Sequence, residues 1–398
     1  MIKLILLLVL LILIVALLLL CAVNAVMVVA RRGNPSKAAV TLVRLKRCAV
    51  LTVAAFLACV GLVLITQFTA YTPAIRENGK RVKGSISELV PVNINRHREW
   101  ISIRGYDASK PILLFLAGGP GGTQMASTRY NLAELEKHFV VVNWDQPGSG
   151  KSYSALPKSQ LTPNVYVKDG ISLTQYLLKR FGQKKLYLVG ESWGSALGIF
   201  MAKERPELYH AVVGTGQMVA FVETERIDYH LALEHAEQRG DDKFIQTLVE
   251  NGEPPYYGED VTWKSAAYLG YLNNMMGANP QIHNNGFQTL RDLSAQEYGL
   301  YDSLNFVRGI VSVFNRVYPQ LYDIDLLTDY TRLELPTYFF LGKHDLNAPL
   351  SLAQEYYEQL DAPYKELVWF EHSGHCPWIN ESDRFVQELV LVSQRHND

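Results

Sequence analysis

Residues 185–200 read KLYLVGESWGSALGIF, and this stretch decides the fold. An apolar run of strand type leads directly into Gly190-Glu-Ser-Trp-Gly194, and a helical segment of small and apolar residues follows without a spacer. The pattern G-x-S-x-G between a buried strand and a helix is typical of a nucleophile elbow, a sharp turn that exposes a serine hydroxyl. Glycines on both sides leave room for the tight backbone. We therefore expect Ser192 to be a nucleophile rather than a serine that only caps a turn.

The segments on both sides of this turn alternate between strand and helix. Continuous apolar runs separated by amphipathic helices predict a mainly parallel sheet with helices on both faces, which is the α/β class. A β-hairpin over residues 86–104 is expected to precede the parallel strands. The expected strands are 111–116, 139–144, 185–189, 210–214, 336–341 and 366–370, and the expected helices are 171–181, 195–205, 350–360 and 382–395.

The strand pattern stops between residues 217 and 330. This stretch has helical periodicity and is too long and too ordered to be a loop. Because open α/β sheets bind their ligands at the carboxyl ends of the strands, we expect the insertion to form a helical cap there. The sequence thus predicts a catalytic core made of residues 76–216 and 331–398, with a cap of residues 217–330 between them.

A serine hydroxyl needs a base, because it is a weak nucleophile at neutral pH. In this type of fold the chain order is serine, then an acid, then histidine. Asp345 and His375 each follow one of the last two expected strands, in that order. We expect His375 to take the proton from Ser192, and Asp345 to orient the ring and stabilise the imidazolium. His372 is the alternative base, and a histidine pair without further ligands does not predict a metal site.

Two backbone N–H groups are needed to stabilise the oxyanion that forms when the serine attacks a carbonyl. One is expected from Trp193, the residue after the nucleophile. The other is expected from the glycine-rich loop Ala117-Gly-Gly-Pro-Gly-Gly122, which follows the strand at 111–116. Gly119 is the first choice for this donor, and Gly118 is the second.

Three glycine-containing motifs lie near the ends of expected strands. They are Leu116-Ala-Gly-Gly-Pro-Gly-Gly122, Trp144-Asp-Gln-Pro-Gly-Ser-Gly-Lys-Ser152 and Gly190-Glu-Ser-Trp-Gly-Ser195. Together they resemble the proline iminopeptidase branch of the α/β-hydrolases. The likeness covers residues 111–380 and is weaker across the cap. It implies a serine hydrolase that removes an N-terminal residue, often proline, from short peptides.

This resemblance also directs attention to acids of the cap and to two departures from the family pattern. It implies a cap carboxylate that binds the ammonium group of the substrate, and Glu223 and Glu225 are the candidates, with Glu234 behind them. The alternative for each is a solvated helix face.

Ala117 stands where the family usually has histidine, and Pro147 stands where it has arginine. These differences concern prolyl specificity and the shape of the acyl pocket, and leave the three catalytic candidates intact.

The N-terminal region predicts a membrane anchor. Residues 4–30 and 48–70 carry no charge, and each is long enough to cross a bilayer as a helix. A cleaved signal peptide is the alternative, but its apolar region is shorter. Residues 31–47 carry six Lys or Arg and no acid, which favours the cytoplasmic side for this connection. We therefore expect residues 1–75 to form a two-helix anchor, with the catalytic domain outside the cytoplasm.

Charge and composition exclude other functions. The first 75 residues hold seven basic and no acidic side chains, so the rest of the chain holds 31 basic and 39 acidic ones. A net charge of −8 argues against nucleic-acid binding.

The leading hypothesis is a membrane-anchored serine aminopeptidase that needs no cofactor or metal. The alternatives are a carboxylic ester hydrolase of esterase or lipase type and, third, a non-catalytic binding domain held at the bilayer. The sequence does not define the oligomeric state.

Overall fold

The computed structural model describes residues 1–284 and 286–396, and the chain divides into two compact units. The first unit combines residues 1–71 with residues 293–303. The second combines residues 72–292 with residues 304–398 and contains the eight-stranded sheet.

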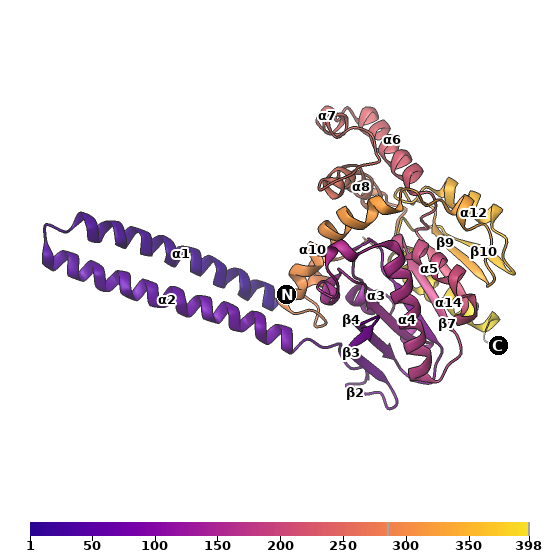
Figure 1. The fold of residues 1–398 in the computed structure, drawn as a ribbon, viewed down its shortest axis with the longest axis horizontal. Helices are drawn as coiled ribbons and strands as arrows, with labels where there is room; N and C mark the ends of the chain where they lie inside the picture. The colour runs from indigo at the N-terminus through magenta and orange to yellow at the C-terminus, as the bar shows by residue number, and fades with distance from the viewer. Residues whose placement is uncertain (285, 397–398) are drawn as a thin grey trace. The chain divides into compact units, whose positions relative to one another are not determined.

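Two long helices, α1 (Ile2–Ala30) and α2 (Pro35–Phe68), run side by side in the first unit (Figure 1). Both are long and apolar enough to cross a membrane, a property that signal sequences and core helices can share. Helix α2 begins earlier than expected, so residues 35–47 are helical rather than part of a loop. The reason is local, since Pro35 occupies the first turn and the Asn34 side chain accepts a hydrogen bond from the backbone N–H of Lys37.

The segment 293–303 belongs to the same unit because it is hydrogen-bonded to the ends of both helices. Near the end of α2, the Thr66 hydroxyl accepts a bond from the backbone N–H of Leu300 at 3.1 Å. The Gln67 amide donates to Asp302 at 2.7 Å. At the start of α1, the Lys3 ammonium donates to the carbonyl of Ala295 at 2.7 Å. A segment expected to belong to the cap alone therefore packs with the N-terminal helices.

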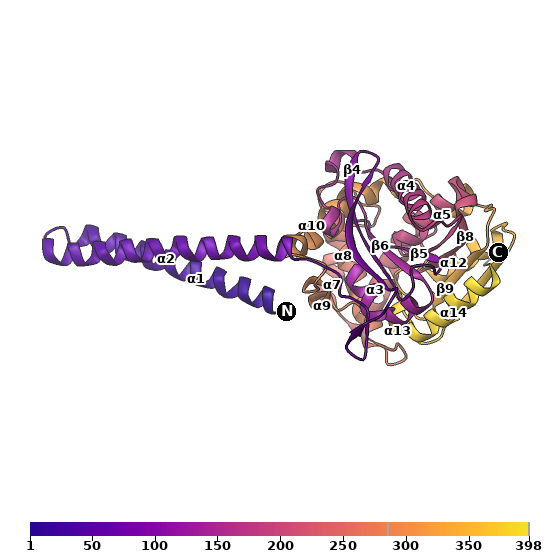
Figure 2. The same cartoon turned by 90° about the horizontal axis from the view of Figure 1, so that it is seen from below.

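The second unit is built on an eight-stranded sheet with the order β10-β9-β8-β7-β5-β6-β4-β3. The six strands from β10 to β6 are mutually parallel, and β4 and β3 extend the edge as an antiparallel hairpin (Figure 2). A separate two-stranded ladder, β1 (Arg76–Glu77) with β2 (Lys80–Arg81), precedes them. The strands are β3 (Ile86–Ile94), β4 (His97–Gly105), β5 (Ile112–Leu116), β6 (Val140–Asp145), β7 (Leu186–Glu191), β8 (Tyr209–Thr215), β9 (Thr337–Gly342) and β10 (Lys365–Phe370).

Helices cover both faces of this sheet, because alternate side chains of each strand point to opposite sides. Phe339 and Leu341 of β9 pack into one apolar cluster, whereas Tyr338 and Phe340 pack into the other. The first cluster also contains residues of α4, α5 and α12, and the second contains residues of α13 and α14. These helices are α4 (Pro163–Phe181), α5 (Trp193–Glu204), α12 (Leu350–Gln359), α13 (Pro377–Asn380) and α14 (Ser382–Arg395).

The expected α/β architecture is confirmed, and each strand inferred from the sequence is present within one or two residues of its expected bounds. The clearest difference is α4, which begins at Pro163 instead of residue 171. Thr162 caps it by accepting a hydrogen bond from the backbone N–H of Val165 at 3.4 Å, and Pro163 is tolerated in the first turn. This cap lies ahead of the apolar periodicity, which is why the periodicity alone placed the start too late.

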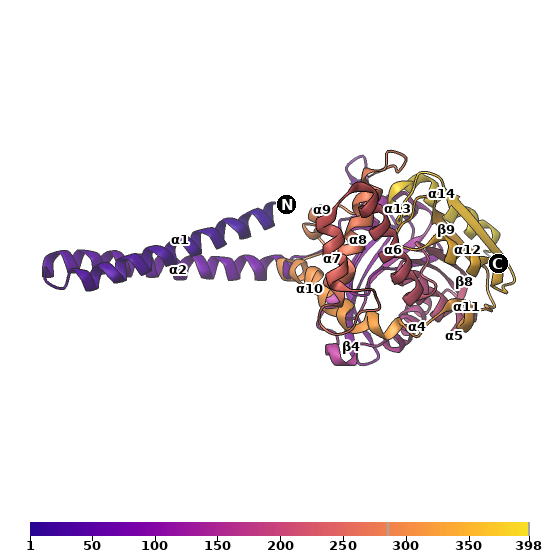
Figure 3. The same ribbon diagram turned by 90° about the horizontal axis from the view of Figure 1, so that it is seen from above.

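A group of helices separates β8 from β9 in the chain. Helices α6, α7 and α8 contact one another and share a small apolar cluster around Tyr229 and Tyr268 (Figure 3). Tyr229, Tyr256 and Tyr268 are therefore part of the core of this group, whereas Tyr257 is 68% exposed. The helices of this stretch are α6 (Phe221–Arg239), α7 (Asp242–Asn251), α8 (Val261–Ala278), α9 (Thr289–Leu293), α10 (Leu300–Val317) and α11 (Leu326–Asp329).

Candidate active site

Ser192 stands in a strained turn between β7 and α5. Its backbone has φ 54° and ψ −123°, a conformation that non-glycine residues rarely adopt and that costs about 1–3 kcal/mol. Its N–H donates to the carbonyl of Thr215 on β8 at 3.0 Å. A Cβ on Gly190 would overlap the carbonyl oxygen of Gly194, and one on Gly194 would overlap that of Leu116. The two glycines are therefore required by the close approach of backbone to backbone.

The carboxylate of Asp345 is held in a fixed orientation after β9. Its Oδ1 accepts hydrogen bonds from the backbone N–H groups of Asn347 at 2.8 Å and Ala348 at 3.1 Å. The Nδ1 atom of His375 lies 2.9 Å from Oδ2 and 3.1 Å from Oδ1 of the same carboxylate. This pairing favours the tautomer with the proton on Nδ1, so Nε2 is the ring nitrogen that can accept a proton.

A second carboxylate, that of Glu191, faces the other edge of the His375 ring. Glu191 is 2% exposed, and its Oε1 lies 3.7 Å from Nε2 of His375. Its Oε2 accepts a hydrogen bond from the Gln124 amide at 2.7 Å. Burial alone would lower the pKa of His375, but the charge and hydrogen bond of Asp345, together with the charge of Glu191, raise it to about 9. The ring is therefore a stronger base than an isolated histidine.

The alternative base, His372, has other partners. Its ring stacks on His283 with centroids 4.1 Å apart, and its Nδ1 lies 3.2 Å from the carbonyl oxygen of Gln281. The Glu381 carboxylate accepts a hydrogen bond from its backbone N–H. His372 therefore interacts with His283, Gln281 and Glu381. The histidine that pairs with Asp345 is His375.

The glycine-rich loop is connected to the elbow through Gln146. The Gln146 side chain accepts a hydrogen bond from the indole N–H of Trp193 at 3.0 Å and donates one to the carbonyl of Ala117 at 3.1 Å. Gly119 has φ +131°, and a Cβ there would meet backbone nitrogens of the same loop at 2.7 Å. Gly118 and Gly119 line a cavity together with Ser192.

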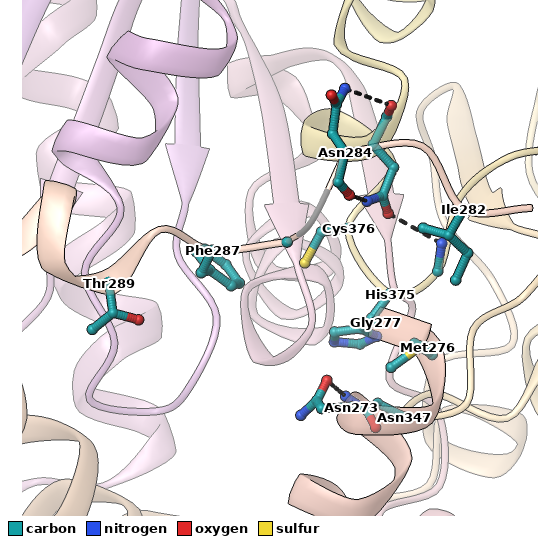
Figure 4. Close-up of a pocket in the computed structure, with 13 residues that line it drawn as sticks. Asn273, Met276, Gly277, Ile282, Asn284, Phe287, Thr289, Asn347, His375 and Cys376 are labelled. Carbon is teal, nitrogen blue, oxygen red and sulfur yellow. Dashed lines mark hydrogen bonds between the residues drawn. The ribbon is translucent and has the colours of Figure 1, made fainter. Parts of the chain in front are cut away.

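Three cavities meet at His375. The first, the polar cavity, has about 500 Å³ and is lined by His375, Cys376 and asparagines such as Asn273 and Asn347, which are hydrogen-bonded at 2.9 Å (Figure 4). The second, the apolar cavity, has about 400 Å³ and is lined by Ser192, His375 and four apolar side chains of residues 287–314. The third, the acidic cavity, has about 90 Å³ and is lined by Ser192, His375, Glu225 and Asp228.

The two acids proposed from the resemblance have different locations. Glu225 is 1% exposed and lines the acidic cavity, whereas Glu223 is exposed on α6. The reason is helix geometry, since residues two apart in a helix do not share a face. Three residues beyond Glu225, on the same face of α6, Asp228 is also 1% exposed and lines the cavity. Asp228 was missed in the sequence, although its spacing from Glu225 is the signal that could have found it.

The two buried acids differ in their hydrogen bonding. The Glu225 carboxylate accepts hydrogen bonds from the hydroxyls of Tyr318 at 2.9 Å, Ser265 at 3.1 Å and Tyr268. Neither carboxylate oxygen of Asp228 has a hydrogen-bond partner among the described residues. Burial raises the pKa of Glu225, although these hydroxyls oppose the shift. Burial, and then the charges of Glu225 and Asp345, raise the pKa of Asp228 well above its usual range.

An eight-stranded, mainly parallel sheet with a serine elbow at one strand end defines the α/β-hydrolase class. The chain belongs to the alpha/beta hydrolase fold family, which residues 111–382 match, and it is a hydrolase. It is similar to the probable aminopeptidase YbaC of Bacillus subtilis (strain 168), with 33% identity over 318 residues, 79% of this chain and 98% of that protein. It is also similar to a proline iminopeptidase of Saccharolobus solfataricus, with 24% identity over 80% of this chain and 92% of that protein.

Solved structures show the same fold. A proline iminopeptidase-related protein from Thermus thermophilus superposes with a TM-score of 0.53 at 18% identity. That comparison covers 78% of this chain and 98% of the other one. At this identity the likeness shows the fold of the hydrolase unit and does not extend to its chemistry.

Proposed function

We propose that this hydrolase is a serine aminopeptidase of proline iminopeptidase type, which releases the N-terminal residue of short peptides. Ser192 is the nucleophile, His375 the general base and acid, and Asp345 the residue that orients His375. The proposal is supported by the strained turn at Ser192, by the 2.9 Å pairing of His375 with Asp345, and by the two cavities that Ser192 and His375 both line.

In the proposed acylation step, Nε2 of His375 takes the hydroxyl proton of Ser192 as Oγ attacks the carbonyl carbon of the first residue. The negative charge that develops on the carbonyl oxygen is stabilised by the backbone N–H groups of Trp193 and Gly119. His375 then gives the proton to the departing amine. In the deacylation step, His375 takes a proton from water, the resulting hydroxide releases the amino acid, and Ser192 is restored.

The observation that carries the aminopeptidase proposal is the unpartnered carboxylate of Asp228 beside Ser192. A buried carboxylate without a cation or donors is costly, so such a group is expected to be protonated or to bind a cation. The α-ammonium of a peptide provides a cation at a fixed short distance from the carbonyl that the serine attacks. A neutral ester has no such group, and Asp228 would stay unpaired when it binds. Glu225, held by three hydroxyls, adds a second carboxyl group to the same cavity.

The size of the acidic cavity bears on specificity. At about 90 Å³ it has room for an ammonium group and a small side chain, but not for a large aromatic one. We expect peptides that begin with proline or alanine to be better substrates than those that begin with tryptophan.

The test compares two carboxylates of α6 that differ in burial. Asp228→Asn should lower kcat/KM for alanine or proline anilides by about 10- to 100-fold, because a hydrogen bond to a charged group contributes about 1.5–3 kcal/mol. Glu223→Gln, on the exposed face of the same helix, should leave this value unchanged. Ser192→Ala should abolish cleavage.

Three outcomes would reject the proposal. If the wild-type protein cleaves short acyl esters but no aminoacyl anilide, it is an esterase. If Asp228→Asn and Glu223→Gln behave alike on anilides, the acidic cavity does not bind the substrate ammonium. If a fluorophosphonate fails to label Ser192 in the folded protein, the serine is not an active nucleophile, and the alternative of a non-catalytic binding domain is favoured.

We also propose that α1 and α2 cross a membrane, with the basic connection in the cytoplasm and the hydrolase unit on the other side. The proposal is supported by their length and composition and by the many exposed apolar side chains, such as Ile2 at 76% and Phe68 at 84%. The test introduces Ser36→Cys or Ser109→Cys into a protein whose native cysteines are replaced by alanine. A membrane-impermeant thiol reagent added to intact cells should label only the second variant, and labelling of only the first would reverse the topology.

A further inference from the structure

The position of the leaving group follows from the way the three cavities share the catalytic residues. The acidic cavity holds the two carboxylates, so it takes the aminoacyl group in the proposed function. The polar cavity is lined by His375 but not by Ser192, whereas the apolar cavity is lined by both. A leaving group is bonded to the carbonyl at Ser192 and receives its proton from His375. The apolar cavity is therefore where the leaving group lies.

The lining of this cavity indicates the chemistry of that group. Most of the surface that lines it is apolar and includes Phe287, Phe306, Ile310 and Phe314. Polar groups are added by Thr123, Gln124, Glu191, Asn273, Thr289 and Asp292. A peptide backbone brings a donor and an acceptor with every residue, and the apolar part of this wall leaves those that face it unsatisfied. An alkyl or acyl chain has no such groups and gains free energy with each methylene that leaves water.

The apolar wall continues onto the surface of the hydrolase unit. Phe287 and Ile310 line the cavity and are also 44% and 42% exposed, so they form its mouth. On α10, Val307 lies three residues before Ile310, and Leu304 lies three residues before Val307. Their side chains are 48% and 54% exposed, respectively. Residues three apart are neighbours on a helix surface. An exposed apolar stripe thus runs from the mouth of the cavity toward the beginning of α10.

The beginning of α10 is hydrogen-bonded to α2, one of the two helices that are long enough to cross a membrane. Within the unit formed by residues 1–71 and 293–303, Leu300 donates to Thr66 and Gln67 donates to Asp302. Phe68 ends α2 one residue beyond Gln67. The stripe on α10 therefore starts one turn after residues that are hydrogen-bonded to the end of an apolar helix.

We propose that the substrate is an amphiphile drawn from the bilayer, in which a small aminoacyl group with a free ammonium is joined by an ester or amide bond to an apolar chain. This inference rests on the proposed function: it keeps the catalytic residues and the ammonium site of the aminopeptidase, and it gives the leaving group as an apolar chain in place of a peptide. The acyl carbon forms a bond to Oγ of Ser192, and the bond to the oxygen or nitrogen of the chain breaks. His375 protonates that atom, and water then releases the amino acid. The apolar stripe on α10 guides the apolar chain into the mouth of the cavity.

The first experiment uses the full chain in phosphatidylcholine vesicles and alanine alkylamides with butyl, hexyl and octyl chains. For each methylene that enters the cavity, kcat/KM should rise by up to about four-fold. Ile310→Asp places a charge at the mouth and should flatten this dependence on chain length. Leu391→Asp changes an equally exposed apolar residue on α14 and should keep it. A flat dependence in the wild-type protein, or an unchanged one in Ile310→Asp, overturns the inference.

A second arm tests the source of the substrate. Alanine dodecylamide is placed either in the vesicles that contain the protein or in separate vesicles. Cleavage should be faster in the first case, and equal initial rates would overturn supply through the bilayer. The anilide assay keeps the two proposals apart. If alanine anilide is cleaved and depends on Asp228 while chain length has no effect, the aminopeptidase survives and the amphiphilic substrate does not.

Discussion

At the scale of single residues, the imidazole of His375 is bounded by negative charge on both sides. Asp345 pairs with Nδ1 at 2.9 Å, and Glu191 lies 3.7 Å from Nε2. The pKa of about 9 means that the ring carries a proton in the free enzyme at neutral pH. A general base must be unprotonated to act. The proposed general base is therefore expected to work best at alkaline pH.

The first prediction concerns the pH profile. In the wild-type protein, kcat/KM for an aminoacyl anilide should rise with pH up to about 9, because only the neutral ring accepts the serine proton. Glu191→Gln removes one of the negative charges that favour the imidazolium, so the rise should move to lower pH. Initial rates between about pH 6 and 10 measure this shift. Glu223→Gln is the control, and equal midpoints in Glu191→Gln and wild type would contradict the prediction.

The second prediction concerns the glycines of the elbow. Gly190→Ala should destabilise the hydrolase unit and abolish activity, because its Cβ would overlap the carbonyl oxygen of Gly194. Gly270→Ala is the matched control. No heavy atom lies within 4 Å of a Cβ at this position of α8, and alanine favours a helix over glycine by about 1 kcal/mol. Melting curves in detergent should show opposite shifts, and similar shifts for both variants would argue against the steric explanation.

At the scale of elements, the antiparallel edge of the sheet is tied to α4 by a buried ionic cluster. Nε2 of His97 lies 2.6 Å from Glu99 on the same strand and 3.0 Å from Asp169 on α4. The Trp144 indole of β6 donates to the other oxygen of Glu99. The hydrogen bond with Glu99 raises the pKa of His97 to about 9, and burial raises that of Glu99 to about 7.

The third prediction follows from these shifts. Both groups hold protons more tightly in the folded than in the unfolded chain, so their contribution to stability is present at low pH and is lost as pH rises. For His97 it is complete below about pH 6.5 and lost through about pH 9. His97→Gln leaves two buried carboxylates without a cation and should cost about 3–5 kcal/mol near neutral pH. Thermal unfolding should show this loss and a weaker pH dependence, and His283→Gln serves as control.

If His97→Gln melts like the wild-type protein at pH 6.5, the cluster does not hold β4 to α4. Recovery of the melting temperature in the double variant His97→Gln with Glu99→Gln would, by contrast, identify the uncompensated charge as the cause of the loss.

At the scale of the whole molecule, the chain combines two units that are not contiguous in sequence. Residues 293–303 are inserted between helices of the hydrolase but belong with the two N-terminal helices. Their hydrogen bonds to Thr66, Gln67 and Lys3 explain this assignment. A boundary drawn at residue 75 from composition therefore describes where the apolar residues end, but not which segments pack together.

The fourth prediction tests this partition in the full chain. Gln67→Ala removes the hydrogen bond to Asp302 and should speed amide hydrogen exchange in residues 293–303, since weakened local contacts lower the free energy of local opening. Exchange in β7 should stay the same. The control is Gln246→Ala, because the Gln246 amide donates to Glu250 at 2.9 Å on the exposed side of α7. Unchanged exchange at 293–303 in Gln67→Ala would show that this contact does not order the segment.

Local sequence patterns were enough to predict the periodic features of this protein: the strand order along the chain, the elbow at Ser192, and the helical insertion before β9. These features are local, because the burial of a strand and the sharpness of a turn depend on patterns in consecutive residues. The choice of His375 over His372 was favoured by position alone, and the pairing with Asp345 now supports it.

The acids near Ser192 and His375, by contrast, could be identified only in the folded chain. Glu191 occupies a variable position of the motif, and Asp228 lies on a helix whose orientation no local pattern specifies. Both matter because the fold removes them from water next to His375 or Ser192. The same holds for the division of the cleft into a small acidic and a larger apolar cavity, since cavity shape depends on side chains that are distant in sequence. Charge and shape at the site arise from packing, and packing is a property of the folded chain.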